Sequence, residues 1–211
     1  MYRMLTDGDI NSMAPRMGVP LEFCGFKSDL PYKIKANKSY IINLDSEEDL
    51  DGDRNTGTHW TCFQVMEYPN GKTEAIYFDS YGVAPPQIVS DRIKRNFDIK
   101  YVPYNTKNIQ SMMSDACGWY CMAFLHFINE NPLRTRMLYT DVETFLDLFN
   151  DLEKKVDWKY NEWMLKQFFQ AKDPAKRKPI DVIGEYDADK LAVFKENEGV
   201  SAIPVETNWM N

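Results

Sequence analysis

The sequence has little histidine and no long hydrophobic run. Only two histidines, His59 and His126, occur among its 211 residues. No apolar stretch approaches the ~20 residues that a membrane-spanning helix needs. The N-terminal run MYRMLTDGDI is too polar and acidic for a signal peptide. These absences predict a protein that is made and kept inside a cell and has no membrane partner.

The sequence also lacks the cysteine spacing of a metal site. Its four cysteines, at positions 24, 62, 117 and 121, include no CxxC pair. The closest two, Cys117 and Cys121, have none of the histidine and cysteine partners that accompany a zinc site. We therefore expect reduced thiols, no metal and no cofactor.

Basic residues are in the minority, with 25 Lys and Arg against 32 Asp and Glu and a net charge of −7. This balance argues against a protein that coats nucleic acid, because neutralising phosphates needs surplus Lys and Arg. A hydrophobic fraction of 44% suits a globular fold, and the length suits one domain with a proper core. We place this domain at 1–171 and a basic linker with an acidic tail at 172–211.

Hydrophobic periodicity predicts an α+β fold. Strands are expected where apolar residues are short and β-branched, and two of them flank an Asn-Gly turn, which is a strong hairpin signal. The segment from 117 to 128 is apolar on all sides, as in a helix buried at the centre of a domain. The expected strands are 38–44, 58–66, 74–80 and 99–104, and the expected helices are 9–17, 86–97, 117–128, 142–155 and 160–171.

Cys117 opens the most buried of these helices, two residues after the expected N-cap Asp115. A cysteine at a helix N-terminus faces the positive end of the helix dipole and free N–H groups, which favours the nucleophilic thiolate. Most cysteines are simply small buried hydrophobic residues, and we interpret Cys24, Cys62 and Cys121 in that way. Cys117 is the candidate nucleophile.

A thiolate nucleophile needs a base, and elimination leaves His59. His126 lies on the same helix as Cys117, about 13.5 Å further along and on the opposite face. The expected hairpin brings His59 close to Asp79, whose carboxylate would orient the imidazole. Gln110, seven residues before Cys117 in a polar loop, could donate its amide to an oxyanion.

Three motifs carry a resemblance to the adenovirus-protease (adenain) family. The run QSMMSDACGWYCMAFLH at 110–126 resembles the family's pattern around its catalytic cysteine, GTHW at 57–60 resembles its G-x-H-W, and YFDSYG at 77–82 resembles its acid-containing segment. The order and spacing of His59, Asp79, Gln110 and Cys117 agree as well. Within the family, the aspartate and the short chain look most like maturation proteases of virophages and Polinton-type elements.

The resemblance implies a circularly permuted papain-like core, in which a central mixed sheet packs on the helix that carries the catalytic cysteine. It implies a cysteine endopeptidase that processes capsid precursors in the virus factory of the host cytoplasm and in the virion. Trp60 follows the base, and Gly118 and Trp119 follow the nucleophile. We interpret these three as substrate-binding residues, and aromatic walls there would favour small residues, notably glycine, at the cut.

The sequence departs from the family in its activators. No cysteine lies between Cys62 and Cys117 to tether a peptide, and the acidic balance does not favour DNA. We expect a monomer that needs neither activator.

Three alternatives remain open: a SUMO-cleaving or ubiquitin-like-protein protease, an acetyltransferase effector on the same His-acid-Cys core, and an inactive interaction module. The spacing of seven between Gln110 and Cys117 favours the viral type over the first. No basic cluster in the core suggests an acetyl-CoA site, and every residue of the expected machinery is present.

Overall fold

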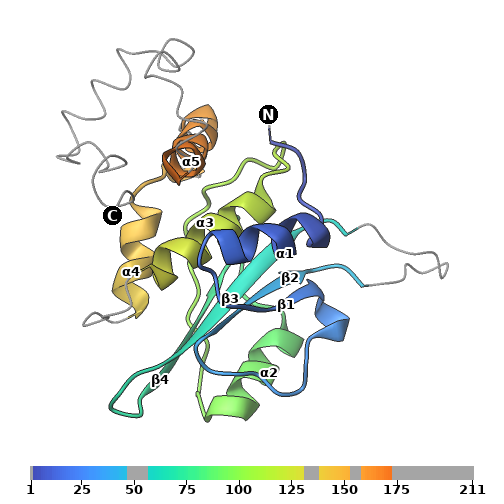
Figure 1. Cartoon of the computed structure of the whole chain (residues 1–211), viewed down its shortest axis with the longest axis vertical. Helices are drawn as coiled ribbons and strands as arrows, with labels where there is room; N and C mark the ends of the chain where they lie inside the picture. The colour runs from blue at the N-terminus through green and yellow to red at the C-terminus, as the bar shows by residue number, and fades with distance from the viewer. Residues whose placement is uncertain (1, 47–56, 131–137, 153–157, 173–211) are drawn as a thin grey trace.

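A four-stranded mixed sheet forms the centre of the protein in the computed structural model, which describes residues 2–46, 57–130, 138–152 and 158–172 (Figure 1). The strands are β1 (Leu21–Phe26), β2 (Lys38–Asn43), β3 (Trp60–Glu67) and β4 (Thr73–Phe78), and they lie in that order. β1 pairs with β2 in parallel, and the other two pairs are antiparallel. The predicted α+β class is confirmed.

The β3–β4 hairpin was predicted correctly. Gly71 closes its turn with a φ of 78°, a conformation that glycine adopts without steric penalty. The last paired residues at the other end are Cys62 and Phe78. His59 and Asp79 therefore lie at the same end of the hairpin, one just before β3 and the other just after β4.

Helices cover both faces of the sheet. α1 (Asp7–Arg16), α3 (Cys117–Asn129), α4 (Leu138–Leu146) and α5 (Trp158–Lys172) lie on one side, and α2 (Gln87–Phe97) lies on the other (Figure 1). Strand side chains alternate between the two cores, as a period of two residues requires. Ile41, Cys62, Ile76 and Phe78 face the α3 side, and Tyr40, Ile42, Phe63, Val65, Ala75 and Tyr77 face α2.

α3 is buried on nearly every side, as the sequence predicted. It contacts β3, α1, α4 and α5. Apolar side chains on all of its faces are therefore required, because each face meets another element. A buried helix with this many neighbours holds its first residue, Cys117, in a fixed position.

α1 begins with a capping box, and it starts two residues before the helix predicted at 9–17. The Thr6 hydroxyl accepts from the Asp9 amide over 3.1 Å, and the Asp9 carboxylate accepts from the Thr6 amide over 3.0 Å. The segment before α1 is fixed to it, since Arg3 forms an ion pair with Asp9 at 2.7 Å.

The strand predicted at 99–104 was wrong. Only a single parallel bridge joins Tyr104 to Tyr77, next to a bond from the Tyr77 amide to the Pro103 carbonyl. Pro103 has no N–H to donate, so this segment cannot extend the ladder along β4.

Two helix boundaries also differ from the prediction. Ala116, not Asp115, is the N-cap of α3, and it provides no side-chain bond. The helix predicted at 142–155 is instead α4, which ends at Leu146. Beyond it, the backbone N–H and C=O of Asn150 are both bound by the side chain of Asn161, each over 2.7 Å, and these bonds replace those of a continuing helix.

α5 confirms the helix predicted at 160–171, with additional residues at its ends. The described residues end at Lys172, so the rest of the predicted linker and tail lies outside them. In the parts of the chain that are described, no helix has the length and apolarity to cross a membrane.

Candidate active site

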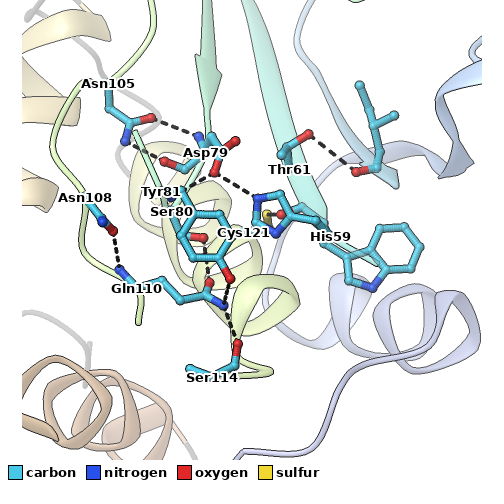
Figure 2. A network of polar contacts seen from close by, with 12 residues as sticks. His59, Thr61, Asp79, Ser80, Tyr81, Asn105, Asn108, Gln110, Ser114 and Cys121 are labelled. Atoms are coloured by element: carbon cyan, nitrogen blue, oxygen red, sulfur yellow. Dashed lines mark hydrogen bonds and ion pairs between the residues drawn. The ribbon is translucent and has the colours of Figure 1, made fainter. Parts of the chain in front are cut away.

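His59 and Asp79 form a hydrogen-bonded pair at the end of the hairpin (Figure 2). His59 Nε2 donates to Asp79 Oδ1 over 2.9 Å, and the two side chains are 13% and 1% exposed. The same carboxylate oxygen accepts from the Tyr81 amide over 2.8 Å. The predicted acid and base are therefore in direct contact, and the acid is held by two donors.

The imidazole of His59 also lies close enough to Cys117 for that side chain to affect its pKa. Nε2 is bound to Asp79, so Nδ1 is the ring nitrogen left to exchange a proton with a sulfur. Burial lowers the pKa of His59, but the hydrogen bond to Asp79 and the charges of Asp79 and Cys117 outweigh it and raise the pKa from 6.5 to about 9. The site therefore favours an imidazolium between a carboxylate and a sulfur.

The backbone around His59 is fixed by the sheet and by a close approach. The His59 carbonyl accepts from the Leu44 amide over 2.9 Å, which extends the β2–β3 pairing by one step. Two residues earlier, Gly57 has a φ of 80°, and a Cβ there would lie 2.2 Å from the Asn43 side chain. Only glycine fits this approach to the strand.

Asn105 holds Asp79 by its backbone. Its Oδ1 accepts from the Asp79 amide over 2.9 Å, and its Nδ2 donates to the Asp79 carbonyl over 2.7 Å. With these two bonds the Asn105 side chain, which is 3% exposed, takes the place of the strand partner that the Asp79 backbone lacks. The turn then closes at Gly82, whose φ is 74° and whose amide donates to the Asp79 carbonyl over 2.8 Å.

Gln110 lies in the same network and is 1% exposed. Its Oε1 accepts from the Ser80 hydroxyl over 2.6 Å. Its Nε2 donates to the Ser114 carbonyl over 2.7 Å and to the Tyr81 hydroxyl over 3.2 Å (Figure 2). The structure therefore brings Gln110 to the segment that carries the acid.

The first turn of α3 has no side-chain cap. Helix N-termini present N–H groups without intrahelical acceptors, and these groups carry partial positive charge. Cys117 is 3% exposed and begins this turn. An uncapped N-terminus at the candidate nucleophile can stabilise a thiolate and an oxyanion.

The remaining cysteines are free thiols without such surroundings. Burial raises the pKa of Cys121 well above its ordinary value, with a further contribution from Cys62. Burial likewise raises the pKa of Cys24. These two thiols are held in the neutral, poorly nucleophilic form.

The three predicted substrate-binding residues contact the N-terminal segment. Trp60 is 6% exposed and donates its indole N–H to the Leu5 carbonyl over 2.8 Å. Trp119 donates to the Arg3 carbonyl over 2.9 Å. A Cβ on Gly118 would lie 3.1 Å from Leu5 Cβ and 3.3 Å from Trp60 Cδ1. Trp60 is thus a core side chain here, and contact of these residues with substrate stays a prediction.

His126 lies away from the pair. Its Nδ1 donates to the Met17 carbonyl over 2.6 Å, and its Nε2 is 3.6 Å from Glu130. It ties α3 to the end of α1. These contacts give His126 a structural role.

Sequence reasoning missed three residues of the network: Ser80, Tyr81 and Asn105. Ser80 and Tyr81 directly follow Asp79, so their position beside the acid was a usable signal. Asn105 had no such signal, because its contact with Asp79 spans 26 residues.

Across the described ranges, no group of three or more His, Cys, Asp or Glu side chains is placed to hold a metal ion. Among protein-family models and curated proteins, no match to this chain was found.

Proposed function

We propose that the protein is a cysteine endopeptidase with Cys117 as nucleophile, His59 as general base and acid, and Asp79 as the residue that orients His59. The observation that carries the proposal is the imidazole of His59, which is hydrogen-bonded to Asp79 and lies close enough to Cys117 for that side chain to raise its pKa. A cysteine, a histidine and a carboxylate in this series form a nucleophilic triad.

Peptide cleavage follows from this arrangement. The thiolate of Cys117 attacks the scissile carbonyl carbon, a C–S bond forms, and the carbonyl electron pair moves to oxygen. N–H groups at the start of α3 stabilise that oxyanion, and Gln110 contributes through the polar network beside them. The imidazolium of His59 protonates the leaving amine as the C–N bond breaks. His59 then accepts a proton from water, whose oxygen attacks the thioester and releases the acid product and the thiolate.

The family resemblance supports a narrower proposal: an adenain-like maturation protease with a circularly permuted papain-like core. In support, a mixed sheet packs on a buried helix that begins at Cys117, and the acid and base lie at one end of a neighbouring hairpin. We propose capsid precursors as substrates, with cleavage at small, glycine-containing sites by a monomer in the virus factory and virion.

Thiol labelling tests the nucleophile first. Iodoacetamide at neutral pH should modify Cys117 before any other cysteine, because burial holds Cys24 and Cys121 in the neutral form. Peptide mapping of the full-length chain locates the modified residue. Preferential modification of Cys24, Cys62 or Cys121 would contradict the assignment.

Cleavage assays then test the activity. The wild type is incubated with capsid precursors of virophage and Polinton type, with a SUMO fusion, and with glycine-containing fluorogenic peptides. Cys117→Ala should abolish cleavage, and Cys24→Ala, which removes a thiol from β1, should retain it. Efficient SUMO processing with intact precursors would favour the ubiquitin-like-protein protease instead.

A further inference from the structure

Tyr81 contacts the acid, the base and the candidate oxyanion amide at once. Its ring stacks on the imidazole of His59, with the centroids 4.5 Å apart and the planes 29° apart. Its amide donates to Asp79 Oδ1 over 2.8 Å, and its hydroxyl oxygen lies 3.2 Å from Gln110 Nε2 (Figure 2). No other described residue contacts all three through hydrogen bonds or ring stacking, and Tyr81 has no part in the proposed mechanism.

The orientation of the Gln110 amide follows from its partners. A backbone carbonyl can only accept, so the NH₂ of Gln110 must face the Ser114 carbonyl, 2.7 Å away. The Oε1 then faces Ser80, whose hydroxyl donates to it over 2.6 Å. One amide proton is therefore used by Ser114, and the other is directed at the oxygen of Tyr81.

The tyrosine hydroxyl keeps its own proton for a further acceptor. An oxygen that accepts from Gln110 can still donate, and this hydroxyl donates to no other described residue. Burial raises the pKa of Tyr81, and the charges of Cys117 and Asp79 raise it further. The hydroxyl is thus protonated at neutral pH and can donate, and its ring stacks on the candidate base His59.

We propose that Tyr81 is a further catalytic residue whose hydroxyl donates to the oxyanion, while Gln110 donates to that hydroxyl. This inference rests on the proposed protease function. The two donors act in series, N–H to O–H to oxyanion, and each bond polarises the next. Tyr81 forms no covalent bond and loses no proton. Its hydrogen bond strengthens as charge develops on the substrate oxygen and weakens when the carbonyl reforms.

Tyr81→Phe in the full-length chain is the central test. Phenylalanine retains a ring that can stack on His59 and removes only the hydroxyl. With a glycine-containing quenched fluorescent peptide that the wild type cleaves, we expect kcat to fall about 10²-fold and KM to change little, as for loss of one oxyanion donor. Tyr101→Phe, at a tyrosine that is 73% exposed, is the matched control and should retain wild-type kcat.

A double-mutant cycle tests the series arrangement. If Gln110 acts through Tyr81, then the double variant Tyr81→Phe with Gln110→Ala should lose little more kcat than the worse single variant. If instead the two losses in kcat multiply, the residues act independently and the relay is wrong.

Alkylation separates an oxyanion role from an effect on the thiol. Iodoacetamide reacts with the thiolate without forming an oxyanion, so Tyr81→Phe should be alkylated at Cys117 at the wild-type rate and with the same pH profile. Slower alkylation would place the role of Tyr81 at the Cys117–His59 pair. An unchanged or higher kcat in Tyr81→Phe would show that the hydroxyl only occupies the Gln110 amide. Either result overturns the proposal.

The failure of the underlying function looks different. Suppose that iodoacetamide labels Cys117 of the wild type, but that unlabelled wild type cleaves neither precursors nor peptides. The protease proposal then fails, and the inference about Tyr81 fails with it. If the wild type cleaves and Tyr81→Phe cleaves equally well, only the inference about Tyr81 fails.

Discussion

The Ser80 hydroxyl donates to Gln110 Oε1 over 2.6 Å, in a place where both residues are almost fully buried. The Ser80 carbonyl also accepts from the backbone amide of Gln110 over 3.1 Å. These two bonds tie the loop that carries Gln110 to the segment that carries Asp79. The orientation of the candidate oxyanion amide therefore depends on the residue next to the acid.

Ser80→Ala should destabilise the protein and lower its turnover. The substitution leaves Gln110 Oε1 buried without its donor, which costs about 1–3 kcal/mol of unfolding free energy. Denaturant unfolding monitored by tryptophan fluorescence measures this loss. Ser114→Ala is the matched control for stability, because no partner of its buried hydroxyl is found within the described residues. A Ser80→Ala variant as stable as Ser114→Ala would contradict this account.

Asp79→Asn should lower kcat by about 10² or more, since a neutral amide can favour the wrong imidazole tautomer and removes the charge that stabilises the imidazolium. Steady-state kinetics on a cleaved peptide measures the loss. Asp115→Asn changes the formal charge equally at an exposed position beside the start of α3 and should leave kcat within a few-fold. Wild-type turnover in Asp79→Asn would mean that another residue orients His59.

The raised pKa of His59 predicts how stability depends on pH. A histidine whose pKa rises on folding binds its proton more tightly in the folded state, so its contribution is complete below about pH 6.5 and is lost as pH rises through about 9. The shift corresponds to roughly 3 kcal/mol. The difference in unfolding free energy between wild type and His59→Gln should shrink by an amount of this order between pH 6 and pH 9.5. A difference that stays constant over that range would rule out the raised pKa.

The same pKa predicts the alkaline limb of activity. Cleavage needs the imidazolium to protonate the leaving amine, so kcat should fall as pH rises through about 9. Removing the carboxylate lowers the pKa of His59, so Asp79→Asn should move this limb to lower pH. A pH profile of the residual activity measures the shift. The Asp115→Asn control should keep the limb of the wild type.

The pairing of His59 with Asp79 could be predicted because a local signal fixes it. The Asn-Gly turn sets the register of two adjacent strands, and both residues lie within three positions of the last pair, Cys62 and Phe78. The burial of the central helix could be predicted equally well, because its apolar residues leave no solvent-facing side. In both cases the pattern in the sequence is also the cause of the structure.

Other parts of the site depend on contacts that no local pattern records. Asn105 binds the backbone of Asp79 across 26 residues, and the predicted strand before it fails because Pro103 cannot donate to a ladder. Ser80 and Tyr81 belong to the YFDSYG motif, but their roles depend on the position of Gln110, which the motif does not predict. Asp115 has the right residue type for an N-cap, yet the helix begins after Ala116 without a side-chain cap.

Trp60→Phe tests what fixes the start of α3. Trp60 binds the Leu5 carbonyl and lies against Gly118, next to the nucleophile. Phenylalanine keeps most of the ring but leaves the buried carbonyl without its donor, which costs about 1–3 kcal/mol. Trp119→Phe removes a similar bond to Arg3 at a more exposed position, where water can replace the donor, so it should cost less.

Comparing these two variants also separates packing from substrate contact. If Trp60 acts by holding the N-terminal segment and the first turn of α3, then Trp60→Phe should lower unfolding free energy and kcat together and leave KM nearly unchanged. If it is instead a wall of the substrate site, KM for glycine-containing peptides should rise while stability is retained. Because Trp60 is only 6% exposed and donates to Leu5, we expect the first result. An increase in KM at full stability would restore Trp60 as a substrate-binding residue and mean that the N-terminal segment moves when substrate binds.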